Sequence, residues 1–144
     1  MKTEIHINEE FDAEIHLVWR AITENDLMAK WYFDLEEFRP DVGFKFEFIS
    51  GPENGFQYNH ICEVTEVIFE KKLAYTWRYE GFEGNTLVTF ELCDQGGKTR
   101  MNFTHSGLSS FPHANPDFAI SNFEVGWSHI ITIALQEFVA TNKY

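Results

Sequence analysis

The sequence predicts an α+β fold in which a curved antiparallel sheet of about six strands wraps around a long C-terminal helix, with two short helices after the first strand. Three observations predict it. Apolar side chains recur about every 3.6 residues near the C-terminus, as in a helix, and every 2 residues through the middle of the chain, as in strands. A shorter helical pattern lies near the N-terminus. Because one face of the sheet is strongly aromatic, a long element must cover it, and we expect the C-terminal helix to do so.

The N-terminal part predicts one strand and two helices. Apolar and polar side chains alternate along residues 3–11, which is typical of a strand with one wet face. We expect Asp12 to cap the following helix, whose apolar residues recur at helical spacing at Ile15, Val18, Trp19 and Ile22. Residues 23–26 have the pattern of a capping box, which predicts a second short helix through Leu27 and Trp31.

The central segment between Gly43 and His105 predicts an antiparallel meander, because turn residues divide it into stretches with a repeat of 2. Rings and aliphatic side chains share one face of these stretches, and charged side chains take the intervening positions. The strand within residues 56–69 has two competing phases, and a bulge could switch between them, so its register stays open.

The C-terminal helix is predicted over residues 115–140, with Asn115 as N-cap and Pro116 at the first helical position. Its length would be about 39 Å at about 1.5 Å per residue. Gly126 lies inside it, where glycine costs about 1 kcal/mol relative to alanine. Two interpretations follow: a neighbouring group approaches closely at Gly126, or the helix kinks there.

The composition limits the class of protein. A chain of 144 residues with 44% hydrophobic positions predicts one domain over residues 1–144. The 23 acidic and 11 basic residues give a formal charge of −12, which argues against nucleic acid as a partner. Neither a secretion signal nor an apolar stretch of bilayer length is present, so we expect a cytoplasmic protein without membrane insertion. Cys62 and Cys93 form no C-x-x-C pair, which predicts buried, reduced thiols.

Short motifs along nearly the whole chain resemble those of one family. They are Phe11-Asp12-Ala13, Val18-Trp19-Arg20-Ala21, Trp31, Val42-Gly43, Leu73-Ala74-Tyr75-Thr76-Trp77, Lys98-Thr99-Arg100, Thr104-His105-Ser106-Gly107-Leu108 and Gly126-Trp127. In order and spacing they resemble the AHSA-type family, named after the activator of heat-shock protein 90 ATPase, within the START-like (SRPBCC) superfamily. The resemblance implies the helix-grip fold of the birch-pollen allergens, with an interior cavity that the superfamily uses to bind lipids, hormones and polyketides.

Candidate ligand-binding residues combine ring or sulfur surface with a predicted inward phase. They are Trp31, Phe46, Phe48, Tyr75, Trp77, Phe90, Met101, Phe103 and Trp127, together with His105. A packed core uses the same residue types, so that alternative stays open. We expect His105 to point toward the cavity mouth and orient or protonate a polar ligand group, or else to bond loop backbone. His60 is a second polar candidate.

The leading hypothesis is binding of a small hydrophobic molecule, lipid-like or aromatic, in an interior cavity. One alternative is a protein-interaction module of the co-chaperone type with a chaperone or other protein partner. Another is a cyclase- or dehydratase-like enzyme that uses His105 as its acid. The sequence has no nucleophile elbow or phosphate-binding loop, and its six histidines lack metal-ligand spacing, so no catalytic motif, metal or cofactor is predicted. The ligand and the oligomeric state stay open.

Overall fold

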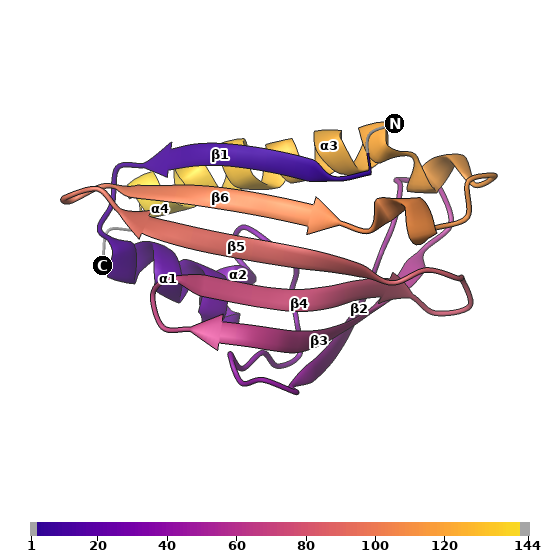
Figure 1. Cartoon of the computed structure of the whole chain (residues 1–144), viewed down its shortest axis with the longest axis horizontal. Coiled ribbons are helices and arrows are strands. Elements are labelled where there is room, and N and C mark those ends of the chain that lie inside the picture. Colours follow the sequence, from indigo (N-terminus) through magenta and orange to yellow (C-terminus); the bar gives the residue numbers. More distant parts are fainter. Residues whose placement is uncertain (1–2, 142–144) are drawn as a thin grey trace.

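The computed structural model describes residues 3–141 as a six-stranded antiparallel sheet with helices on its concave side (Figure 1). The strand order is β1-β6-β5-β4-β3-β2, so each strand after the first pairs with its neighbour in sequence and β1 closes against β6. The predicted α+β fold is confirmed. The strands are β1 (Ile5–Phe11), β2 (Lys45–Ser50), β3 (Tyr58–Ile68), β4 (Lys72–Tyr79), β5 (Thr86–Asp94) and β6 (Thr99–Ser106).

The two short helices are present, but their caps differ from those predicted. Helix α1 (Ile15–Thr23) begins after Glu14 and helix α2 (Asn25–Met28) begins after Glu24, and neither residue makes a side-chain capping bond. The prediction that Asp12 caps α1 is therefore wrong. The predicted capping box is also absent, because the Thr23 hydroxyl donates back to the Trp19 carbonyl at 2.7 Å within α1.

The predicted long C-terminal helix is present, but it begins at Ile120 rather than at residue 115, and its middle part is π-helical. A short 3₁₀ turn, η2 (Pro116–Phe118), precedes α3 (Ile120–Ser128), a π-helical segment η3 (His129–Leu135) and α4 (Gln136–Thr141). The break falls at Ala119, whose backbone is extended. Asn115 does act as a cap, but of η2: its side-chain oxygen accepts from the Asp117 N–H at 2.9 Å. Residues 115–118 therefore form a turn separate from α3, with its own orientation relative to the sheet.

The π-helical segment follows from the spacing of the buried side chains. Trp127, Ile131, Leu135 and Val139 are all buried and recur every four residues. In a regular α-helix, each step of four advances the side chain by roughly 40° around the axis, so the row would turn away from the sheet. A wider π turn rotates less per residue and compensates for this drift. The segment thus keeps one row of side chains on the core.

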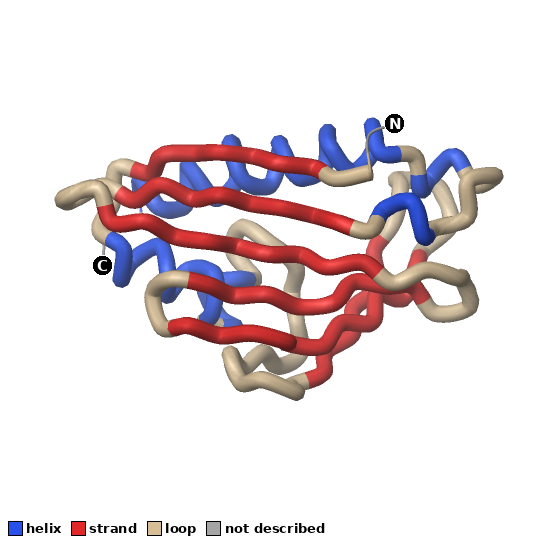
Figure 2. The backbone as a smooth tube through the Cα atoms, in the orientation of Figure 1, coloured by secondary structure: helices blue, strands red, loops and turns tan. Residues whose placement is uncertain are grey.

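The core lies between the sheet's concave face and the helices. The predicted inward residues of β4, β5 and β6 are buried, and the open register of β3 resolves with Tyr58, His60, Cys62 and Val64 inward. The pairing of β3 with β4 shifts between Val64 and Glu66, where the sequence allowed for a bulge. Figure 2 shows the C-terminal helical run behind β1 and β6, while the loop after α2 lies behind β3 and β4. The C-terminal helical run and the loop after α2 therefore cover different parts of the same concave face.

Two local predictions are wrong. A Cβ built on Gly126 meets nothing within 4 Å, so neither close approach nor a kink explains this glycine; α3 continues through it. Cys93 is exposed rather than buried, while Cys62 is buried as expected, and both thiols are free. Cys93 follows the buried Leu92 in β5, so the alternation of side chains along the strand places it on the outer face of the sheet.

Candidate ligand-binding pocket

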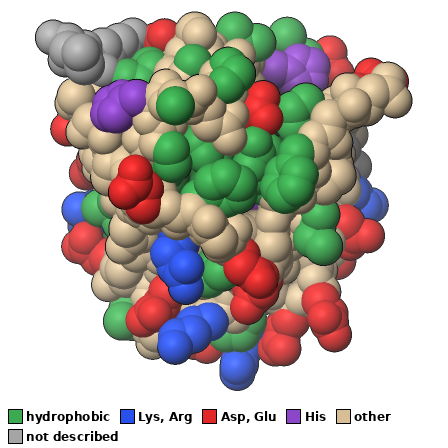
Figure 3. All heavy atoms as spheres, turned by 90° about the vertical axis from the view of Figure 1, so that its right-hand side faces the viewer, with side chains coloured by type: hydrophobic (Ala, Val, Ile, Leu, Met, Phe, Trp, Pro, Cys, Tyr) green, Lys and Arg blue, Asp and Glu red, His purple; other side chains and the backbone are tan. Residues whose placement is uncertain are grey.

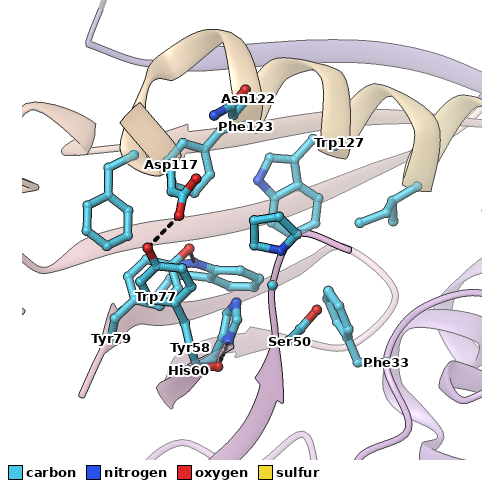
Figure 4. Close-up of a pocket in the computed structure, with 15 residues that line it drawn as sticks. Phe33, Ser50, Tyr58, His60, Trp77, Tyr79, Asp117, Asn122, Phe123 and Trp127 are labelled. Carbon is cyan, nitrogen blue, oxygen red and sulfur yellow. Dashed lines mark hydrogen bonds between the residues drawn. The ribbon is translucent and has the colours of Figure 1, made fainter. Parts of the chain in front are cut away.

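A pocket of about 590 Å³ opens at the end of the sheet, between the loop that follows β2 and the exposed start of α3. Its lining comes from four places: the loop after α2, the end of β2 with the β2–β3 loop, strands β3 and β4, and the segment from η2 to η3 (Figure 4). Figure 3 views this end of the molecule directly and shows that hydrophobic side chains gather over it. The lining residues are Phe33, Ser50, Gly51, Pro52, Tyr58, His60, Trp77, Tyr79, Asp117, Phe118, Asn122, Phe123, Gly126, Trp127 and Ile130.

The aromatic walls of the pocket are held by internal contacts. Trp77 and Trp127, from the sheet and from α3, lie with ring centroids 5.2 Å apart. The Trp77 indole N–H donates to the Tyr79 hydroxyl at 2.9 Å, and the Trp127 indole N–H donates to His105 at 2.9 Å. Phe123 stacks on Phe111 beside them. Because both indole N–H groups are satisfied within the protein, these side chains present apolar ring surface to the pocket.

A hydrogen-bonded group of three side chains joins β3 to η2 at one side of the pocket. The Tyr58 hydroxyl donates to Asp117 Oδ2 at 2.6 Å and accepts from the Asn115 side-chain amide at 3.1 Å. Figure 4 shows the Tyr58–Asp117 bond crossing from the strand to the turn. Burial, followed by the bond to Asp117, raises the pKa of Tyr58 from its ordinary value, so the hydroxyl keeps its proton. The bond fixes where η2 lies relative to the sheet.

His60 extends from β3 into the pocket (Figure 4). Its Nδ1 lies 3.0 Å from the Tyr58 carbonyl oxygen, and its ring stacks on Phe48 with centroids 4.3 Å apart. Burial lowers the pKa of His60 to about 4, so the ring is neutral near pH 7. Because a carbonyl oxygen only accepts, Nδ1 carries the proton and Nε2 is a hydrogen-bond acceptor.

His105 does not point toward a cavity mouth, and this prediction is wrong. The residue has 0% exposure and does not line the pocket. Its Nδ1 accepts from Trp127, and its Nε2 lies 2.7 Å from the Thr86 hydroxyl, whose own proton goes to the Trp77 carbonyl at 2.6 Å. Burial lowers the pKa of His105 to about 3. With both nitrogens engaged inside the core, this side chain is not placed to protonate a ligand.

Two of the other predicted residues, Trp77 and Trp127, line the pocket. Phe48 lines a second, more acidic groove along β2, the edge strand of the sheet. The rest fill the core away from the pocket, because the C-terminal helical run and the loop after α2 cover those parts of the aromatic face. They are Trp31, Phe46, Tyr75, Phe90, Met101 and Phe103.

Sequence reasoning missed most of the polar lining. Tyr58 and Asp117 lie 59 positions apart, and nothing in their local patterns indicates that they meet. Phe33 lies in the loop after α2, where no repeat indicates which way a side chain points. The one usable signal was the Asn-Pro-Asp sequence at residues 115–117, which was interpreted as the start of the long helix and gave no sign of what these residues contact.

Other classes of site are not visible in the described chain. Residues 3–141 hold no group of three or more His, Cys, Asp or Glu side chains placed to bind a metal ion. Over the same residues, no helix combines the length and apolar character needed to cross a lipid bilayer.

Comparison with solved structures shows the fold. Protein MLL2253 from Mesorhizobium loti is similar with a TM-score of 0.78 and 23% identity, over 98% of this chain and 99% of that one. Mll3558 from Rhizobium loti gives a TM-score of 0.82 at 17% identity, over 94% and 96% of the two chains. DynU16, a protein in the dynemicin biosynthetic locus, gives a TM-score of 0.78 at 18% identity, over 99% of this chain and 49% of its own.

Comparison at the level of sequence shows the family. No curated protein matches the chain. The family described as Activator of Hsp90 ATPase homolog 1-like protein matches residues 12–140, which include five of the six strands and all the helical segments apart from the last residue of α4. The motifs that carried the resemblance, from Val18-Trp19-Arg20-Ala21 to Gly126-Trp127, lie inside that match. The chain therefore belongs to the Activator of Hsp90 ATPase homolog 1-like family, and its fold is the helix-grip fold of START-like proteins.

Proposed function

We propose that the protein binds a small, ring-containing hydrophobic molecule in the pocket between the β2–β3 loop and α3. The single observation that carries the proposal is the pocket itself, about 590 Å³ and walled mainly by aromatic rings. That volume falls within the roughly 300–1,000 Å³ typical of small-molecule sites, which combine apolar walls with a few polar groups. A second hollow of about 620 Å³ lies beside β2, but four of its eight lining residues are acidic, which suits a hydrophobic ligand less well.

The walls are already in place, which favours binding. Trp77 and Trp127 have their N–H groups satisfied inside the protein, and Tyr58 is fixed by Asp117 and Asn115. A ligand therefore does not have to order these side chains, and the entropy cost of binding is reduced. Membership of a family with the START-like fold, and likeness to a protein in a biosynthetic locus, are compatible with small-molecule binding.

Gly126 offers a direct test. It lines the pocket, and a side chain added there meets no neighbour within 4 Å. Gly126→Phe should therefore occupy the ligand space without disturbing the core. Val125→Phe is the matched control, because Val125 is 72% exposed on the same helix and lies outside the pocket.

The experiment is a thermal-shift screen of neutral and charged ring compounds, followed by calorimetric titration of the hits. A ligand at 100 times its dissociation constant should add about 2.7 kcal/mol to the free energy of unfolding. Binding should be lost in Gly126→Phe and retained in Val125→Phe. If hits bind Gly126→Phe as tightly as the unmodified protein, or if no ring compound binds at all, the proposal is wrong.

A further inference from the structure

The polar groups of the pocket restrict the charge of a ligand, provided that the proposed function holds. Among the residues that line the pocket, Asp117 carries a negative charge, and none is Glu, Lys or Arg. Asp117 already accepts from the Tyr58 hydroxyl through Oδ2. The second carboxylate oxygen, Oδ1, takes no part in that bond. A carboxylate oxygen at the pocket wall is therefore available to a hydrogen-bond donor.

The remaining polar side chains of the lining are neutral and supply both acceptors and donors. The Nδ1–H of His60 is directed to the Tyr58 carbonyl, which leaves Nε2 as a lone-pair acceptor. One amide N–H of Asn122 donates to the Pro116 carbonyl at 2.8 Å, which leaves its second N–H and its side-chain oxygen. The Ser50 hydroxyl, also in the lining, can donate or accept. The Tyr79 hydroxyl accepts from Trp77 and keeps its own proton, so it supplies a neutral donor. A ligand anion would thus find no positive partner, whereas a donor-rich cation would find several acceptors.

We propose that the pocket selects a cationic amine carried on an aromatic body over a carboxylate of the same shape. Asp117 would pair with the ammonium group, and the rings of Trp77 and Tyr79 would cover the apolar part. An ammonium group near aromatic faces is further attracted by the ring quadrupole. The chain's formal charge of −12 acts in the same direction, because it attracts cations and repels anions at longer range.

Three ligands with one ring system separate charge from shape: 2-(1-naphthyl)ethylamine, 2-(1-naphthyl)ethanol and 3-(1-naphthyl)propionate. Calorimetric titration of the full chain at pH 7 should give the tightest binding for the amine, about tenfold weaker binding for the alcohol, and weaker binding again for the carboxylate. A tenfold ratio corresponds to about 1.4 kcal/mol. The amine's advantage should shrink as salt is raised, because screening weakens charge pairing in a partly exposed pocket.

Asp117→Asn tests the assigned partner, since the amide oxygen can still accept from Tyr58 while the charge is removed. This change should reduce amine affinity about tenfold, leave the alcohol within about twofold, and improve the carboxylate. Asp41→Asn removes the same charge from an exposed position outside the pocket and serves as the control. It should leave all three affinities within about twofold.

The outcomes distinguish this inference from the proposed function. If the carboxylate or the alcohol binds the unmodified protein as tightly as the amine, the inference is overturned while ligand binding in the pocket stands. The same holds if Asp117→Asn and Asp41→Asn lower amine affinity equally, because the effect would then come from net charge. If none of the three compounds binds and the wider screen also finds no ligand, the proposed function itself fails.

Discussion

The indole N–H of Trp127 donates a hydrogen bond to Nδ1 of His105 over 2.9 Å, inside the core where α3 crosses β6. An indole N–H only donates, so Nδ1 must accept and the His105 proton lies on Nε2, facing the Thr86 hydroxyl. Thr86 in turn donates to the Trp77 carbonyl. One chain of three hydrogen bonds thus joins the C-terminal helix, β6, β5 and β4, and it holds the Trp127 ring in place.

Thr86→Val should destabilise the protein by about 1–3 kcal/mol, because it leaves the buried His105 Nε2–H without an acceptor. Urea unfolding followed by tryptophan fluorescence measures this. Thr104→Val is the control, since the half-buried Thr104 hydroxyl makes only a 3.4 Å contact with His6 at the surface. Its effect should stay within about 0.5 kcal/mol. Equal effects of the two changes would show that the buried chain contributes nothing specific.

Stability should fall as the pH is lowered below about 6.5. Burial lowers the pKa of His60 to about 4 and of His105 to about 3, against an ordinary value of 6.5. Between pH 6.5 and about 4 the unfolded chain therefore binds more protons at these two positions than the folded chain. The contributions of the two neutral histidines to the free energy of unfolding are fully present above pH 6.5. They are lost as the pH falls toward the folded-state pKa values, and together they change by up to about 2.7 kcal/mol per pH unit.

Equilibrium unfolding at a series of pH values compares the unmodified protein with His60→Gln. The variant should show a slope lower by about 1.4 kcal/mol per pH unit between pH 6 and 5, because one proton fewer is taken up on unfolding. An unchanged slope would mean that His60 is protonated as easily in the folded state as in the unfolded chain.

Gly126→Ala should stabilise the protein by up to about 1 kcal/mol. Gly126 lies within α3, where alanine is the better helix former, and its added Cβ meets nothing within 4 Å. Thermal unfolding of Gly126→Ala measures the gain. Gly84→Ala gives the contrast, because Gly84 has φ +108° and its Cβ would lie 2.6 Å from Phe111. That variant should be destabilised; a loss in Gly126→Ala as well would contradict the open space at the pocket.

Tyr58→Phe should cost about 1–3 kcal/mol, since it removes a hydroxyl that bonds to the Asp117 carboxylate and to Asn115. Because this hydroxyl joins β3 to η2, amide hydrogen exchange should also become faster over residues 115–118. Tyr32→Phe, which removes the buried bond to the Tyr75 hydroxyl, is a control for losing a tyrosine hydroxyl elsewhere. Tyr32→Phe should leave hydrogen exchange in residues 115–118 unchanged. If both variants exchange equally fast there, the Tyr58 hydroxyl does not specifically hold η2 against β3.

The two thiols should differ in reactivity. Cys93 is exposed, whereas Cys62 has 1% exposure and burial raises the pKa of its thiol. A disulfide reagent such as Ellman's should therefore label one thiol promptly in the native protein and two in denaturant. Cys93→Ser should abolish the prompt reaction. Prompt labelling of two thiols without denaturant would show that β3 opens readily.

The sequence by itself determined the class of fold and the faces of its strands. Phe46 and Phe48, or Phe103 and His105, could be assigned to one face because side chains alternate along any strand. The turns between strands could be placed for the same kind of reason, since glycine and polar turn residues act locally. Family membership also followed from the order and spacing of short motifs along the chain.

Only the tertiary structure decided where space remains and which polar groups meet. A repeat of 2 shows that His105 points inward, but not that Trp127 and Thr86 enclose it on both sides. Likewise, Tyr58 and Asp117 lie 59 residues apart and come together because η2 separates from α3 and rests on β3. Local patterns reflect backbone geometry over a few residues, whereas a pocket depends on how distant elements pack against one another.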